Sequence, residues 1–149
     1  MNATTDKIYD ELQEILEKNR DAVKGYKKAA ENTDHSGLKA YFERKATERS
    51  QFNSELGREI KAAYTDFDID GSFAGSIHRA WMDVKSLFSA DDAESMLEES
   101  IRGDKAAIDE YNDVLEETGI SQSLRSLLTQ QRNKIQQDIS KNNSLENLH

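Results

Sequence analysis

Residues 8–63 specify most of the architecture of this chain. They read IYDELQEILEKNRDAVKGYKKAAENTDHSGLKAYFERKATERSQFNSELGREIKAA. Apolar residues recur at steps of three and four over residues 8–30 and again over residues 38–63, which predicts two helices that each bury one face. The segment Asn32–Asp34 between them contains turn-forming residues and no apolar side chain. Because this connection is short, we expect the two helices to form an antiparallel hairpin.

The same periodicity returns in the second half of the chain. Residues 96–115 and 124–139 carry a third and a fourth amphipathic pattern. Gly119 is the residue type that often follows a helix end, and Ser121 is a typical N-cap for the next helix. These features predict a second hairpin, followed by a polar tail at residues 141–149 that is expected to fray.

A long crossover at about residues 64–89 separates the two hairpins. Its first half contains alternating acids and two glycines, and its second half predicts a short helix over Ile77–Phe88. A single long crossover makes the second and third long helices run parallel. The sequence therefore predicts one all-α domain: a four-helix bundle over residues 1–140 whose crossover carries a short extra helix.

Composition narrows the possible functions. The chain has 149 residues and a formal net charge of −9, which suits one domain and argues against a protein that binds nucleic-acid backbones. It contains no cysteine, which excludes disulfides, thiolate zinc sites and cysteine nucleophiles. No apolar run approaches the roughly 20 residues that span a bilayer, and residues 1–12 lack the pattern of a secretory signal. We therefore expect a cytoplasmic protein that binds neither nucleic acid nor membrane.

Each long amphipathic pattern contains one polar residue halfway along its buried face. These residues are Asn19, Arg49, Asp104 and Gln131. Polar groups at the middle of a bundle are costly to bury, so they mark either a metal site or a hydrogen-bonded structural layer. The favoured interpretation is a structural layer, in which an Arg49–Asp104 ion pair is hydrogen-bonded to Asn19 and Gln131.

A metal centre is the alternative interpretation of this layer. Di-iron helical bundles place a Glu on two helices and a Glu-x-x-His motif on the other two. The three histidines here, His35, His78 and His149, all lie outside the four amphipathic patterns. Glu146-x-x-His149 matches the motif literally, but it ends the chain, where no bundle centre exists.

Carboxylates alone could form a less usual metal site. Asp104 lies on its helix's buried stripe, and Glu48 and Glu98 lie one position off theirs. These three acids are the candidate ligands, although Arg49 brings a competing positive charge to the same layer. We expect no cofactor, and a metal ion remains the alternative.

The crossover contains a weaker candidate for calcium. Asp66, Asp68 and Asp70 alternate before Gly71, as in the first half of an EF-hand loop. The bidentate acid expected at the twelfth loop position is instead Ile77, so the ligand that closes such a site is missing. A solvated acidic loop is the simpler interpretation.

Several motifs resemble an uncharacterised bacterial family of four-helix bundles with a ferritin-like fold, a domain of unknown function. The most specific motif lies in the crossover, and weaker similarities lie in the first three long helices. The crossover motif is Gly71-Ser72-x-x-Gly75-x-x-His78-Arg79-x-Trp81-Met82-Asp83-x-Lys85, and the helix motifs are Asn19-Arg20-Asp21 with Gly25-Tyr26, Arg49 with Phe52, and Arg102-Gly103-Asp104 with Tyr111. The resemblance covers nearly the whole chain except the tail.

This resemblance implies a fold but no defined activity. Members of the family often carry a His-Asp pair on the last helix, where this chain reads Gln137-Asp138. The chain also shows no nucleophilic triad and no phosphate-binding glycine loop. We therefore expect a non-enzymatic ferritin-like bundle that acts through binding or assembly, as a homo-oligomer and in stress adaptation. The alternative is a metal-binding ferritin-like protein with an atypical carboxylate site.

Overall fold

The computed structural model describes the backbone of residues 3–69 and 93–146 and the side chains of residues 6–69 and 96–140. Within these ranges the chain forms four α-helices and no strand. The helices are α1 (Ala3–Asn32), α2 (Ser36–Ala63), α4 (Ala93–Leu115) and α5 (Gln122–Glu146). The prediction of an all-α four-helix bundle is confirmed, whereas the extra helix expected over Ile77–Phe88 lies outside the described residues.

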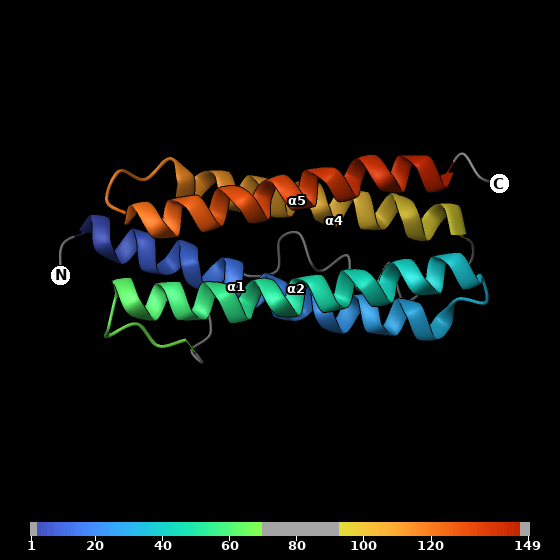
Figure 1. Cartoon of the computed structure of the whole chain (residues 1–149), viewed down its shortest axis with the longest axis horizontal. Helices are drawn as coiled ribbons and strands as arrows, with labels where there is room; N and C mark the ends of the chain where they lie inside the picture. The colour runs from blue at the N-terminus through green and yellow to red at the C-terminus, as the bar shows by residue number, and fades with distance from the viewer. Residues whose placement is uncertain (1–2, 70–92, 147–149) are drawn as a thin grey trace.

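The bundle consists of two antiparallel hairpins packed against each other (Figure 1). Helices α1 and α2 form one hairpin, and α4 and α5 form the other. The hairpins meet along two seams, where α1 contacts α4 and α2 contacts α5. In Figure 1, α2 and α4 run in the same direction, as the single long crossover predicted.

Local hydrogen bonds explain where the helices begin. His35 precedes α2 as its N-cap, and its Nδ1 accepts a hydrogen bond from the Leu38 amide at 3.1 Å. Ser121 has the predicted N-cap role for α5, because its hydroxyl accepts from the Leu124 amide at 3.2 Å. Helix α5 extends to Glu146, beyond the predicted end at residue 140, because no Gly or Pro follows Gly119 to stop it.

The apolar core consists of two clusters that follow one another along the bundle axis. One cluster, near the α4–α5 turn, is built around residues such as Leu12, Leu56 and Leu128. The other, near the α1–α2 turn, is built around Tyr26, Phe42 and small alanines. Two of the polar residues predicted at the bundle centre, Arg49 and Asp104, belong to neither cluster, although both are fully buried.

The start of the crossover is fastened to α1. Phe67 is buried, and the Tyr9 ring packs edge-on against it with ring centroids 5.2 Å apart. The Tyr9 hydroxyl donates to Asp66 at 2.5 Å, and Gln13 donates to the carbonyl of Asp68 at 2.6 Å. These contacts hold residues 64–69 along the first half of α1.

None of the helices within residues 3–69 and 93–146 combines the length and the apolar character needed to cross a bilayer. Their exposed faces are rich in charged side chains.

Candidate functional site: a buried polar layer

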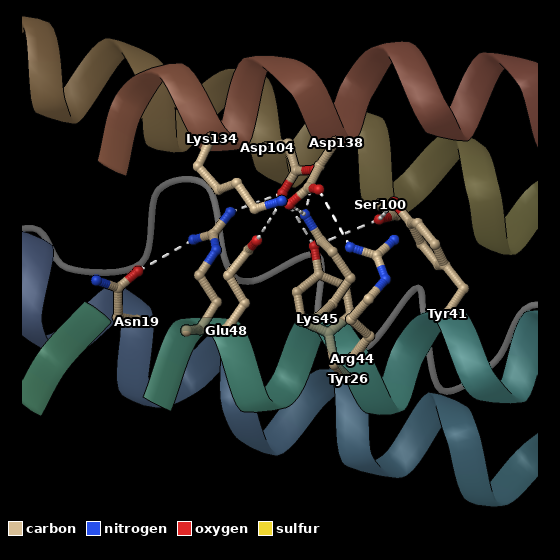
Figure 2. A network of polar contacts seen from close by, with 11 residues as sticks. Asn19, Tyr26, Tyr41, Arg44, Lys45, Glu48, Ser100, Asp104, Lys134 and Asp138 are labelled. Atoms are coloured by element: carbon tan, nitrogen blue, oxygen red, sulfur yellow. Dashed lines mark hydrogen bonds and ion pairs between the residues drawn. The ribbon is translucent and has the colours of Figure 1, made fainter. Parts of the chain in front are cut away.

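The centre of the bundle contains a network of charged side chains that have no exposed surface (Figure 2). Asp104 of α4 accepts hydrogen bonds from groups on two other helices. Arg49 Nη2 of α2 lies 2.6 Å from Asp104 Oδ1, and the Tyr26 hydroxyl of α1 donates to the same oxygen at 3.1 Å. The Arg49–Asp104 ion pair expected from the sequence is therefore present.

Lys45 supplies a second buried cation to this network. Its ammonium lies 2.6 Å from Asp104 Oδ2 and 3.2 Å from Asp138 Oδ2, so it bridges carboxylates on α4 and α5. It also lies 5.3 Å from the centroid of the Tyr26 ring, within the range of a cation–π contact. Arg44 adds a longer contact of 3.4 Å to Asp138 Oδ1. The ammonium thus joins three helices at one point.

A neutral branch extends the network toward the α4–α5 turn. Arg49 Nη1 donates to Asn19 Oδ1 at 3.0 Å, and Asn19 Nδ2 donates to the Tyr111 hydroxyl at 3.3 Å. Tyr111 in turn donates to Gln131 Oε1 at 2.7 Å. Gln131 was expected to contact the ion pair directly, but the Tyr111 hydroxyl lies between them because its ring spans the distance from α4 to α5. The four sequence-predicted polar residues therefore form one hydrogen-bonded chain that depends on Tyr111.

Burial shifts the pKa values of the phenols in the network. Desolvation raises the pKa of Tyr26 well above its usual value, and it raises the pKa of Tyr41 and of Tyr111 to about 12. For Arg49, burial opposes the charged form, but the facing Asp104 carboxylate outweighs it and raises the pKa. These residues therefore keep neutral phenols and a charged guanidinium at neutral pH, so none of them exchanges a proton there.

Glu48 and Asp138 form a carboxyl–carboxylate pair beside the network. Burial, followed by a hydrogen bond with Asp138, raises the pKa of Glu48 to about 8. Burial also opposes ionisation of Asp138, but the Glu48 hydrogen bond and the Lys45 ammonium outweigh it and lower the pKa of Asp138 to about 2. The pair therefore holds one proton at neutral pH.

A groove of about 570 Å³ lies on the outer side of this pair, between α2 and α5. Glu48 lies at the groove, and Lys134 Nζ lies 3.8 Å from Glu48 Oε1. The groove gives solvent a route to Glu48, while Asp104, Lys45 and Arg49 stay fully buried behind it. A ligand in the groove would therefore meet Glu48 and not the central ion pairs.

The central side chains do not fit a carboxylate-bound metal centre. The Lys45 ammonium occupies the position between Asp104 and Asp138 where a bridging cation would bind, and Arg49 covers the other oxygen of Asp104. Across the side chains that the structure describes, no group of three or more His, Asp and Glu residues is placed to hold a metal ion. Two internal cations already balance the buried acids.

The structure separates the three sequence-predicted carboxylate ligands. Glu48 and Asp104 both reach the polar network, but Glu98 is exposed on α4. Glu98 lies six residues before Asp104, which turns it about 120° around the helix and away from the bundle centre. The structure therefore brings two of the three candidate ligands to the polar layer and leaves Glu98 outside it.

The candidate residues of the crossover are only partly described. Asp66 and Asp68 are exposed, and the carboxylate of Asp66 accepts the hydrogen bond from Tyr9, which raises the pKa of that phenol to about 12. The third acid of the calcium-like loop, Asp70, lies outside the described residues. The crossover signature also lies outside them, with His78, Arg79, Trp81 and Asp83.

Sequence reasoning missed the most important member of the network, Lys45. A usable signal existed, because Tyr41, Lys45 and Arg49 recur at steps of four and so share one face of α2. Lysine is almost never fully buried unless it is paired, which favours assigning it to the surface. Ser100 was also missed; its hydroxyl lies 3.3 Å from that of Tyr26 and 3.4 Å from that of Tyr41.

A second buried ionic group closes the other seam. Lys18 of α1 pairs with Glu14 at 2.9 Å and also with Glu110 of α4, and all three side chains are largely buried. Nearer the α4–α5 turn, Glu11 shares a hydrogen bond with Glu117, and burial followed by this bond raises the pKa of Glu11 to about 7. Ionic contacts therefore join the hairpins along both seams.

Comparison with known families gives one match. Residues 7–117 match a domain of unknown function, DUF2383, and this range includes most of α1, all of α2 and α4, and most of the polar network. No curated protein matches the chain. Because the match covers well over half of its length, the chain belongs to the DUF2383 family.

Proposed function

We propose that this protein is a non-enzymatic, ferritin-like four-helix bundle that acts through binding or assembly. In this proposal, the salt-bridged layer has a structural role and stands in place of a di-iron site. The observation that carries the proposal is the position of Lys45, whose ammonium bridges Asp104 and Asp138 at 2.6 and 3.2 Å.

The burial of the layer supports a structural role. A catalytic group must reach its substrate, but Lys45, Arg49 and Asp104 have no exposed surface. Each charge faces an opposite charge, which is the usual arrangement for ions retained inside a protein. The layer therefore resembles a device that specifies how helices pair more than it resembles an active site.

The ferritin-like part of the proposal rests on topology and on the motif resemblance. Two hairpins joined by one long crossover, with α2 parallel to α4, are the arrangement found in ferritin-like bundles. A bacterial origin, a cytoplasmic location and a role in stress adaptation are proposed on the same resemblance. Assembly into a homo-oligomer is part of the proposal, because bundles of this kind commonly pair along their helices.

Elemental analysis of protein purified without chelator tests the structural role against the metal-binding alternative. We expect iron, manganese and zinc to be far below one ion per chain, in the wild type and in an Asp104→Ala variant alike. A stoichiometric metal that is lost in Asp104→Ala, but retained in a matched Asp109→Ala variant of an exposed α4 acid, would establish the alternative.

Sedimentation velocity over a range of protein concentrations tests the assembly proposal. We expect a sedimentation coefficient that rises with concentration toward that of an oligomer. A single monomer species at every concentration would remove assembly and leave binding as the proposed mode of action.

A further inference from the structure

A second groove lies between α1 and α2 and has a different chemical character from the rest of the surface. Its volume is about 520 Å³, within the range of small-molecule sites. Its polar lining consists of Arg20, Lys24 and Lys27 from α1 and Ser50, Asn53 and Ser54 from α2. The groove thus gathers three cations and no acid, although the chain as a whole has a net charge of −9.

The spacing on the two helices explains why these residues meet. Arg20, Lys24 and Lys27 recur at steps of four and three, so they form one strip along α1. Ser50 and Ser54 are four residues apart and present exposed hydroxyls from the facing side of α2. Cations on one wall therefore face hydroxyl donors on the other.

The floor of the groove is a fixed part of the fold. Asn53 donates to the Leu16 carbonyl at 2.9 Å and accepts from Asn19 at 3.1 Å, so both ends of its amide are held. Val23 adds an apolar surface beside it. The Asn19 contact also links the floor to the polar layer, which makes the groove rigid before any ligand binds.

The two lysines of the groove form no close ion pair with the described residues, although Lys24 attracts the Asp21 carboxylate from a greater distance. Across the described residues, no carboxylate lies within 4.0 Å of the ammonium of Lys24 or of Lys27. Other lysines of α1 do have such partners: Lys18 pairs with Glu14 and Glu110, and Lys28 lies 3.9 Å from Glu31. Arg20 donates to the Ile69 carbonyl at 3.4 Å, which holds its guanidinium near one end of the groove.

We propose that this groove binds the phosphate or diphosphate group of a small soluble molecule. Clustered cations with added hydroxyl donors are the groups that recognise phosphate oxygens through charge-assisted hydrogen bonds. The net charge of −9 repels extended polyanions and anionic membranes, so a compact ligand that touches only the groove is favoured over either. The groove lies apart from the central ion pairs, so this proposal stands whether or not the layer has the structural role proposed above.

Isothermal titration calorimetry with inorganic pyrophosphate at low ionic strength tests the proposal. We expect saturable binding that weakens as salt is added. A triple variant, Arg20→Gln with Lys24→Gln and Lys27→Gln, should lose roughly tenfold or more of the affinity. The matched control changes Lys7, Arg102 and Lys105 to Gln, which removes three charges from exposed positions away from the groove and should keep the affinity within about twofold.

A second variant tests whether pyrophosphate binds in this groove. Ser54→Asp places a carboxylate in the groove and should weaken pyrophosphate binding as strongly as the triple variant, and it remains usable if the triple variant does not fold. The absence of saturable binding would overturn the proposal, as would equal losses in the triple variant and its control. Binding to phosphatidylglycerol-containing vesicles without binding to pyrophosphate would also overturn it, because the headgroup would then be the ligand.

Discussion

At the scale of single residues, Lys45 determines the character of the polar layer. A divalent cation between Asp104 and Asp138 would balance the two acids, and the Lys45 ammonium achieves the same balance with a covalently attached charge. Its partners lie on α4 and α5, so this balance exists only when the two hairpins are docked. The stability of the layer is therefore inseparable from the assembly of the bundle.

Replacing Lys45 by Met should be among the most damaging single changes in the protein. It leaves two buried carboxylates without their shared cation, and removing one partner of a buried ion pair costs about 3–5 kcal/mol. Urea denaturation measures this loss as a change in the free energy of unfolding. The exposed Lys105→Met change on α4 is the control and should alter it by about 0.5 kcal/mol or less.

A double variant separates pairing from packing. Lys45→Met combined with Asp104→Leu removes both charges, so its cost should be well below the sum of the two single changes. Additive costs would show that the ammonium and the carboxylate do not interact in solution.

The Glu48–Asp138 pair predicts how stability depends on pH. The folded-state pKa of Glu48 is raised from 4.5 to about 8, so the folded chain binds more protons in that range. The stability from this proton is fully present below pH 4.5 and is lost as the pH rises through about 8. The lowered pKa of Asp138 affects stability at acidic pH. Its contribution to the stability of the fold is present above pH 3.8 and is lost as the pH falls through about 2.

Glu48→Gln removes the first of these effects without removing the hydrogen bond to Asp138. Its free energy of unfolding should decline less with rising pH than that of the wild type, and it should be the more stable protein above pH 8. Glu11, with a pKa of about 7, titrates in the same range. The Glu11→Gln variant therefore shows how much of the decline in the free energy of unfolding comes from the Glu11–Glu117 contact. Parallel pH profiles for Glu48→Gln and the wild type would contradict the shared proton.

At the scale of helices, the α4–α5 turn is closed by a side chain and not by its glycine. Arg125 donates to the carbonyl of Leu115 at 2.6 Å and to that of Glu117 at 2.7 Å. The last carbonyls of a helix have no partner within the helix, so this guanidinium satisfies the end of α4 from within α5. The predicted role of Gly119 as the residue directly after the helix is wrong, because α4 already ends at Leu115.

Arg125→Met should therefore destabilise the bundle by about 1–3 kcal/mol, because it removes two charge-assisted hydrogen bonds. Arg125→Lys should recover only part of this loss, since an ammonium cannot reproduce the paired geometry of a guanidinium. Thermal unfolding followed by circular dichroism gives the ranking. Equal stability of the Met and Lys variants would show that the paired hydrogen bonds of the Arg125 guanidinium do not contribute to stability.

The helices themselves were predictable, and the details of the layer were not. Steps of three and four identified all four helices, because burial of one face leaves that period in the sequence. The same patterns predicted the Arg49–Asp104 pair. They could not predict that Lys45 turns inward or that Tyr111 separates Gln131 from the ion pair, because those outcomes depend on partners that come from other helices. Periodicity indicates which face of a helix is buried, but not which side chains of other helices contact that face.

At the scale of the whole molecule, the buried ion pairs that cross between the hairpins all have the same polarity. The cations Lys18, Lys45 and Arg49 come from α1 and α2, and the acids Asp104, Glu110 and Asp138 that face them come from α4 and α5. A shift of one hairpin along the other by a single turn would separate these pairs inside a low-dielectric core. The charges therefore specify one docking register, which apolar packing alone defines less sharply.

This division predicts that neither hairpin folds fully without the other. A peptide of residues 1–69 contains Lys45 and Arg49 without the acids of α4 and α5, and a peptide of residues 93–149 contains Asp104 and Asp138 without their cations. Each peptide also lacks the apolar surface of the other hairpin. Each should be only partly helical alone, and a mixture should gain helicity beyond the sum of the two, as measured by circular dichroism. A Lys45→Met version of the first peptide should lose most of this gain, whereas Lys39→Met on the exposed side of α2 should keep it. If both variants complement equally well, the register is set by apolar packing and the buried charges do not specify it.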